Sequence, residues 1–179
     1  MKISIKQLMI TALMLGLGLI LPSFFHMLGA GPVMLPMHIP VLICGLMCGA
    51  PYGALCGAIL PFLSSALTGM PPMFPTALSM ALELATYGLV TGLLYRRWAW
   101  NIYAAMLLSM LAGRVVSGLA NAVLLGLSGG TYTVQAFLTA AFVTSIPGIV
   151  IQLLFVPVIV LALTKAQLVE KPKKSSKTA

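Results

Sequence analysis

The stretch TALSMALELATYGLVTGLLYRR, which spans Thr76–Arg97, decides the fold class of this chain. It places about 20 residues with a single charged side chain, Glu83, directly before two arginines. A segment of this length and composition crosses a bilayer as one helix, and arginines at its end mark the cytoplasmic face. We therefore predict a transmembrane helix from Thr76 to Tyr95 that ends inside the cell.

The whole chain has the composition of a membrane protein. Hydrophobic residues make up 60% of its 179 residues and charged residues 7%, whereas a soluble domain carries roughly 25% charged residues. At about 20 residues per span, the length allows six helices, or at most seven short ones, and leaves no room for a soluble module. We expect one transmembrane domain over residues 1–166 and a basic, disordered cytoplasmic tail over residues 167–179.

Six apolar segments follow one another along the chain, with prolines, glycines and charged residues between them. They are Ser4–Leu21, Leu35–Ala50, Gly53–Leu67, Thr76–Tyr95, Asn101–Leu127 and Val134–Thr164. Pro22 is expected to end the first segment, and the prolines of TGMPPMFP (Thr68–Pro75) exclude a continuous helix after the third. The sixth is long enough for an extra turn or a kink at Pro147 or Pro157. The predicted fold is an all-α integral membrane protein, a bundle of six transmembrane helices.

The basic residues set the predicted orientation. With the N-terminus inside, nine of the ten fall at the N-terminus, at Arg96–Arg97 or after the last apolar segment, on the cytoplasmic side. The three outer loops, Ser23–Val33, Thr68–Pro75 and Ser128–Thr133, contain no lysine or arginine. This is the positive-inside pattern, so both termini are predicted to be cytoplasmic. The basic residues that give the net charge of +8 thus flank a lipid bilayer, and the charge does not indicate nucleic-acid binding.

Two charged side chains lie inside apolar segments, Glu83 and Arg114. Each costs roughly 2.5–3.5 kcal/mol on membrane-insertion scales, so it is expected to face the bundle interior and to have a partner. One interpretation is an ion pair that braces the bundle. The other is a substrate cavity in which Arg114 binds a carboxylate or another anion. The two interpretations can coexist.

Other polar residues extend the candidate substrate site. Asn121 follows Arg114 by seven residues, nearly two helical turns, so the two share one stripe of a helix. His38, Tyr87 and Gln152 are further candidates for a polar cavity, although a single histidine such as His38 is more often a hydrogen-bonded structural residue.

Several functions are excluded or disfavoured by what the sequence lacks. It has no G-x-x-x-x-G-K-[ST] loop, so the chain is not expected to hydrolyse ATP, and no H-E-x-x-H or G-x-S-x-G motif, so no enzymatic activity or catalytic residue is expected. Cys44, Cys48 and Cys56 lie in apolar helical stretches without a complete ligand set, so we interpret them as packing residues and expect no metal or cofactor.

Small residues recur at a spacing of four in several segments, which lets helices approach closely in lipid. Gly45, Gly49, Gly53 and Gly57 form one such series, and Gly88 and Gly92 another, for which internal packing is the simplest explanation. Ala12 and Gly16 lie on the first helix, which is often peripheral, and are our candidates for docking onto another membrane subunit.

The stretches LPMHIPVLICGLMCG (Leu35–Gly49) and LSSALTGMPPMFPTALSMALELATYGLVTGLLY (Leu63–Tyr95) resemble the substrate-binding S components of energy-coupling-factor (ECF) vitamin transporters. The first helix agrees, since ALMLG (Ala12–Gly16) is similar to the family's Ala-x-x-x-Ala motif with glycine at the second position. The resemblance covers essentially the whole chain. It implies capture of a vitamin or related micronutrient near the outer face, where Phe25 and Phe74 can cover the ligand.

The resemblance also implies partners and a location. An S component docks onto a transmembrane T subunit that carries two ATPase subunits, in the bacterial cell membrane, where it works as a multi-pass subunit of an ABC importer. Pantothenate is our first expectation for the substrate because Arg114 favours an anion, with riboflavin, niacin or a pyridoxine- or thiamin-related compound as alternatives. Two other functions stay open: a small stand-alone proton-coupled carrier that uses Glu83, and a non-transport membrane scaffold protein.

Overall fold

The computed structural model describes residues 4–27, 29, 34–127, 133–139 and 143–166, and all regular structure among them is helical. The main helices are α1 (Ile5–Met27), α3 (His38–Cys48), α4 (Ala50–Thr68), α5 (Leu78–Gly92), α6 (Ile102–Leu127), α7 (Val134–Leu138) and α8 (Ile146–Lys165). Two short segments flank α5: η1 (Met73–Ala77), which is kinked at the extended residue Phe74, and the π-helical turn η2 (Leu93–Arg97). The predicted tail, 167–179, lies outside the described residues.

Five helical segments are long and apolar enough to cross a membrane, namely Ile5–Phe25, Ala50–Thr68, Met73–Arg97, Ile102–Leu127 and Ile146–Lys165. The sixth predicted span is α3, which at 11 residues rises only about 16 Å and is shorter than the hydrocarbon core. All of α3 except Ile39 is buried, and its neighbours are α1, α4, α5 and α8. The chain is therefore an all-helical membrane protein, and the count of six spans stays a prediction.

Four predicted boundaries change in the structure. α1 continues through Pro22 to Met27, because a proline near the end of a helix removes only one local hydrogen bond. α3 and α4 are separated by Gly49 alone, whose positive φ of 95° breaks the helix. α4 begins at Ala50 and places Pro51 in its first turn, where a proline's missing N–H has no helical partner to lose.

The fourth change concerns the last predicted segment, Val134–Thr164, which is not one helix. α7 covers Val134–Leu138, Thr144 and Ser145 form a turn, and α8 begins at Ile146 with Pro147 in its first turn. The sequence offered an extra turn or a kink at Pro147 or Pro157; Pro147 instead lies in the first turn of a new helix, and Pro157 lies inside that helix.

Glycine contacts hold α3, α4 and α5 together as the centre of the bundle. A Cβ atom at Gly88 of α5 would overlap the backbone of Gly53 in α4, and one at Gly57 would overlap the backbone of Leu84. Gly45 of α3 also meets the Gly88 carbonyl oxygen, 2.7 Å from its ideal Cβ position. These backbone-to-backbone contacts explain the spacing of four between the glycines, and they place α5 in the interior.

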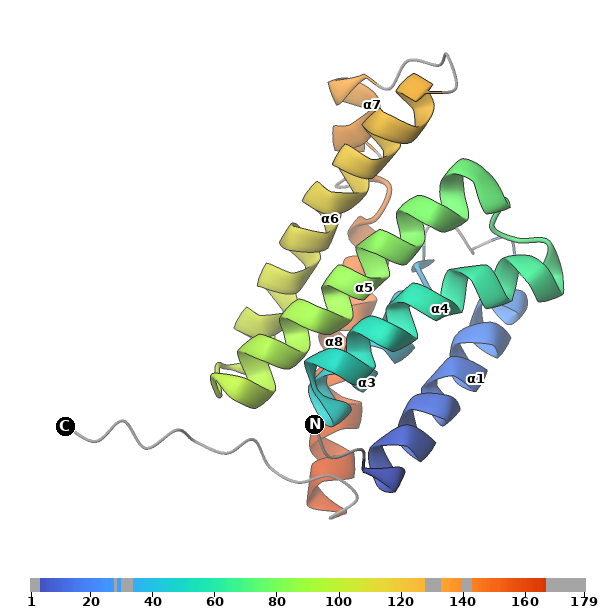
Figure 1. Ribbon diagram of the computed structural model, residues 1–179. Helices are drawn as coiled ribbons and strands as arrows, with labels where there is room; N and C mark the ends of the chain where they lie inside the picture. The colour runs from blue at the N-terminus through green and yellow to red at the C-terminus, as the bar shows by residue number, and fades with distance from the viewer. Residues whose placement is uncertain (1–3, 28, 30–33, 128–132, 140–142, 167–179) are drawn as a thin grey trace.

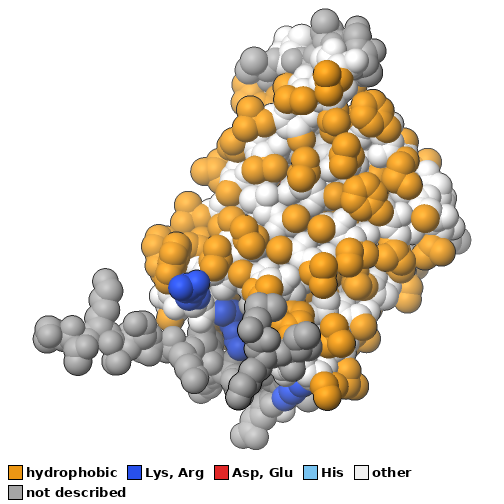
Figure 2. Space-filling model, in the orientation of Figure 1, with side chains coloured by type: hydrophobic (Ala, Val, Ile, Leu, Met, Phe, Trp, Pro, Cys, Tyr) orange, Lys and Arg blue, Asp and Glu red, His pale blue; other side chains and the backbone are white. Residues whose placement is uncertain are grey.

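Apart from the buried Arg114, the described lysines and arginines gather at one end of the molecule. The start of α1, the end of η2 and the end of α8 lie close to that end, at the bottom of Figure 1, and they carry Lys6, Arg96–Arg97 and Lys165. Figure 2 shows the exposed lysine and arginine side chains of the visible face at this same end, while the rest of that face is mainly hydrophobic. This arrangement agrees with the predicted positive-inside orientation, which stays a prediction.

Candidate functional site

A buried polar cluster joins three helices near the centre of the bundle. Glu83 of α5 lies with Oε1 3.3 Å from Nη1 of Arg114 on α6 and 3.5 Å from Nε2 of His38 at the start of α3. Glu83 is 4% exposed, His38 2% and Arg114 8%. One carboxylate therefore has two nitrogen partners in a site that solvent hardly reaches. The ion-pair interpretation of Glu83 and Arg114 agrees with this geometry.

Tyr87 belongs to the same cluster. It follows Glu83 by one helical turn on α5 and so lies on the same face. Its ring meets the His38 ring edge to face at a centroid distance of 5.1 Å. On the other side the tyrosine ring packs against Gly113 of α6, where a Cβ atom would overlap it. The glycine thus lets α6 approach α5 closely enough for Arg114 to reach Glu83.

Four buried polar atoms of the cluster, and one on α8 outside it, have no hydrogen-bond partner among the described residues. They are Nδ1 of His38, the hydroxyl oxygen of Tyr87, Nε and Nη2 of Arg114, and, on α8, Nε2 of Gln152. Buried polar groups are normally paired, because an unpaired group loses its hydration without compensation. These atoms are therefore available to a bound ligand or to internal water.

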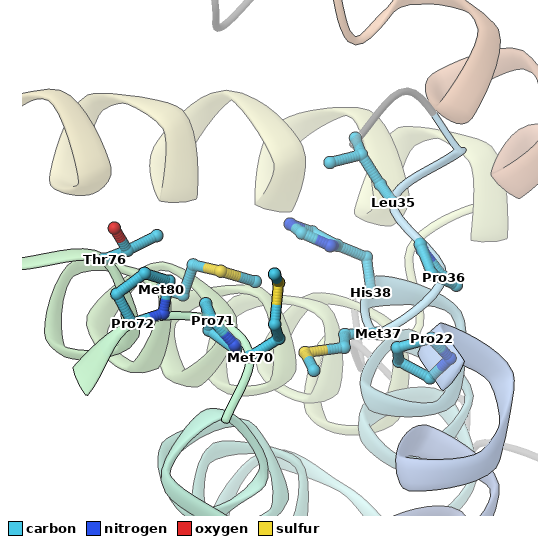
Figure 3. Close-up of a pocket in the computed structure, with 10 residues that line it drawn as sticks. All are labelled: Pro22, Leu35, Pro36, Met37, His38, Met70, Pro71, Pro72, Thr76 and Met80. Carbon is cyan, nitrogen blue, oxygen red and sulfur yellow. The ribbon is translucent and has the colours of Figure 1, made fainter. Parts of the chain in front are cut away.

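A cavity of about 260 Å³ adjoins this cluster. Its wall contains four prolines, three methionines, one leucine and two polar residues, which are Pro22, Pro36, Pro71, Pro72, Met37, Met70, Met80, Leu35, His38 and Thr76. The wall comes from α1, the start of α3, the loop before α5 and the first turns of α5 (Figure 3). The cavity lies at the opposite end of the α5 segment from Arg96–Arg97.

His38 is the residue that connects the cavity with the buried cluster. It lines the cavity, and it also contacts Glu83 and Tyr87. Figure 3 shows its ring extending from the start of α3 toward the space that Met70 and Met80 border. The sequence places this ring between Pro36 and Pro40, and the rigid prolines fix the start of the helix around it.

The remaining predicted site residues lie outside this arrangement. The Asn121 side-chain nitrogen donates to the Ser117 carbonyl one turn back on α6 at 2.9 Å. Phe25 is half-buried and packs against Phe24, and Phe74 is 53% exposed; neither lines the cavity. Gln152 is fully buried on α8, and its Nε2 has no hydrogen-bond partner among the described residues.

The apolar wall of the cavity is what sequence reasoning largely missed. Met37 and Met80 were not singled out, because methionines in an apolar chain look like ordinary core residues. A usable signal was the gathering of prolines in LPMHIP (Leu35–Pro40) and MPPMFP (Met70–Pro75), since prolines that cluster at helix ends make rigid irregular backbone. Irregular backbone at membrane depth is tolerated where it lines a cavity.

Comparison with known proteins identifies the family. Comparisons with curated proteins and with solved structures found no match. A family profile described as "ECF transporter, substrate-specific component" matches residues 6–160, which is most of the chain and includes every residue of the cluster and of the cavity wall. The chain therefore belongs to the substrate-specific component family of ECF transporters, and is a substrate-binding subunit of a membrane transporter.

Proposed function

We propose that this chain captures a small vitamin-like micronutrient from outside a bacterial cell for ATP-driven uptake by an ECF-type ABC importer. The observation that carries the proposal is the cavity between α1, α3 and α5, with buried unpaired polar atoms beside it and the basic residues at the other end of the molecule. By the positive-inside rule this cavity faces outward, where an importer must collect its substrate.

The size of the cavity bears on the substrate. Ligand pockets commonly measure about 300–1,000 Å³, and this cavity of about 260 Å³ falls just below that range. A second cavity of about 380 Å³ shares Pro22 and Met70 with it, so the cavity volume does not separate the larger candidates from the smaller ones. The expectation of pantothenate rested on a free Arg114, but Arg114 contacts Glu83 and does not line the cavity. Pantothenate thus stays a candidate, but without a free arginine in the cavity wall to support it.

The exposed side of α1 supports docking to a T subunit that carries two ATPases. Ala12 is exposed, and an added Cβ at Gly16 would meet nothing within 4 Å. The other face of α1 is occupied, because Gly18 packs against Leu60 of α4. A small-residue face that the bundle does not use is suited to a second membrane protein.

Ligand binding by the purified protein tests the proposal. Calorimetry in detergent across pantothenate, niacin, pyridoxine, riboflavin and thiamin is expected to show one ligand bound with sub-micromolar affinity. Uptake in liposomes is then expected only with the energy-coupling module and ATP. No binding by folded protein would refute the proposal, and uptake driven by a pH gradient without ATP would assign the chain as a proton-coupled carrier instead.

A cavity-filling variant tests the location of the binding site. Met80→Trp places a large side chain in the wall of the cavity, so we expect ligand binding to be lost while the protein still folds. The matched control is Leu82→Trp, two residues away on the same helix with its side chain 47% exposed, which should bind normally. Calorimetry and thermal unfolding of both variants are the measurements. Normal binding by Met80→Trp would place the site elsewhere.

A further inference from the structure

The turn between η2 and α6 carries both tryptophans of the sequence, Trp98 and Trp100. Trp98 is 57% exposed and Trp100 46%, and Tyr103 in the first turn of α6 is 50% exposed. An indole or phenol ring is largely apolar but has one polar group, so it is favoured where acyl chains meet headgroups and water. Three exposed rings at the end of a membrane-spanning segment therefore indicate the level of the membrane surface.

The backbone holds this turn in place. The Trp100 N–H donates to the Leu94 carbonyl at 3.0 Å, which ties the turn to the preceding helix. The side-chain oxygen of Asn101 accepts from the Tyr103 N–H at 2.9 Å, which ties it to α6. Ala99, between the two tryptophans, has a φ of 53°, the left-handed conformation that commonly ends a helix. The rings therefore project from a fixed part of the fold.

The exposed side of α6 leads directly to this turn. Tyr103, Leu107 and Leu111 are spaced by four residues and are 50%, 51% and 52% exposed, so they form one side of the helix. On a membrane-spanning helix such an apolar side contacts acyl chains. At 26 residues, α6 rises about 39 Å, which exceeds the roughly 30 Å of the hydrocarbon core. The start of α6 and the turn before it therefore lie at the level of the lipid headgroups.

A positive charge without a protein counter-charge lies next to the rings. Arg97 is exposed and has no ion pair among the described residues. Glu83, the only acidic residue in the described part of the chain, is buried with its own partners. Figure 2 shows that exposed lysine and arginine side chains of the visible face lie at this end of the molecule, near hydrophobic ones. A guanidinium group binds phosphate through paired hydrogen bonds, so a lipid can supply the counter-charge.

From these observations we infer that the turn Arg97–Tyr103 binds the headgroup of an anionic phospholipid. The Arg97 guanidinium contacts the phosphate, and the rings of Trp98 and Trp100 lie between the headgroups and the acyl chains. An anionic lipid is preferred over a zwitterionic one because two adjacent arginines attract net negative charge. With the predicted orientation this lipid belongs to the cytoplasmic leaflet. The inference is independent of the ligand that the cavity binds.

A lipid fits this turn better than a protein partner does. The turn continues the exposed apolar side of α6, whereas the small residues proposed for docking lie on α1, at the other side of the bundle in Figure 1. Close docking of helices within the membrane needs small side chains. The turn instead presents large rings and a charge, which suit the boundary between acyl chains and headgroups.

Tryptophan fluorescence tests the depth of the turn without any variant, because Trp98 and Trp100 are the only tryptophans of the sequence. In liposomes, lipids with bromine atoms near the top of their acyl chains should quench the emission more than lipids brominated at mid-chain. Stronger quenching at mid-chain would overturn the inference. Quenching by aqueous iodide on both sides of the membrane, with little quenching by either lipid, would also overturn it and would leave the turn open to a protein partner.

Competition between two lipids tests the headgroup. Liposomes of phosphatidylglycerol and phosphatidylcholine in equal parts are prepared twice, with bromine on one lipid or on the other. We expect the relative binding constant at the tryptophans to favour phosphatidylglycerol about two- to fivefold. It should fall toward one when salt is raised from about 0.05 M to about 0.5 M, because salt screens exposed charges. Equal quenching by the two lipids at low salt would overturn the inference.

A variant connects the lipid preference to the arginine. Arg97→Gln should remove at least about half of the preference for phosphatidylglycerol, because it removes the charge next to the rings. Lys6→Gln removes another exposed charge at the same end, on α1 at the other side of the bundle in Figure 1, and should leave the preference unchanged. Thermal unfolding of both variants checks that they fold. A folded Arg97→Gln variant with the full preference, or equal losses in the two variants, would overturn the inference; if Arg97→Gln does not fold, the salt dependence decides.

Discussion

Helices α1 and α5 carry the same small-residue spacing and use it in opposite ways. In the span that contains α5, 56% of the most apolar window is buried inside the protein, against 22% in α1. Gly88 and Gly92 of α5 touch the backbones of Gly53 and Ala50 in α4. Ala12 is exposed on α1, and nothing of this chain lies within 4 Å of a Cβ at Gly16. The spacing therefore indicates that another helix can approach closely, but it does not say whether that helix belongs to this chain or to a partner.

The contrast extends to the polar residues. α5 contributes Glu83 and Tyr87 to a cluster shared with α3 and α6. α1 carries the exposed Ser23, whose hydroxyl donates to the Leu19 carbonyl of its own helix at 3.1 Å. A helix that packs against several neighbours can hold a charge because those neighbours supply the partner. A helix that faces lipid satisfies its polar groups locally.

The largest expected effect comes from breaking the buried pair on the central helix. Glu83→Gln removes the carboxylate and leaves the Arg114 charge buried without its partner. The expected loss in the free energy of unfolding is about 3–5 kcal/mol, as for other buried ion pairs broken on one side. Denaturant unfolding in detergent micelles measures it.

The double variant Glu83→Gln with Arg114→Met is the control for that prediction. It removes both charges, so most of the lost stability should return, and the two substitutions should be far from additive. Additive losses would mean that Arg114 does not depend on Glu83. Arg114 would then be better explained as a residue that binds the ligand directly.

Much of the fold and part of the site could be predicted from sequence, and the limits have physical causes. Apolar length and charge placement mark the long helices, and two lone charges in apolar segments point to a buried cluster. The sequence cannot show that Gly49 alone separates α3 from α4. The glycines from Gly45 to Gly57 keep the same spacing of four on both sides of Gly49, so the pattern does not mark where one helix ends. Nor can it show that Arg114 is held by Glu83 and kept out of the cavity wall, since that depends on how closely α6 approaches at Gly113.

A one-methyl change compares the two helices directly. Gly88→Ala forces a Cβ into the Gly53 backbone, so we expect a loss of about 1–3 kcal/mol in the free energy of unfolding. Gly16→Ala on α1 adds the same methyl to open space and should leave stability unchanged or raise it by up to about 1 kcal/mol, because alanine favours helix over glycine. Thermal unfolding of the two variants side by side is the measurement. Equal effects would remove the distinction between an occupied and an open small-residue face.

The smallest effect on the isolated protein is expected at Ala12, where the proposed partner would bind. Ala12→Trp changes an exposed position of α1, so stability should shift by no more than about 0.5 kcal/mol and ligand binding should be unchanged. ATP-driven uptake with the energy-coupling module should nevertheless fall at least tenfold, because the bulky ring prevents close helix approach. Leu67→Trp, at an α4 position that is 68% exposed, is the control and should transport normally. Normal binding with lost uptake separates docking from capture, whereas full uptake by Ala12→Trp would show that the open face of α1 is only a lipid contact.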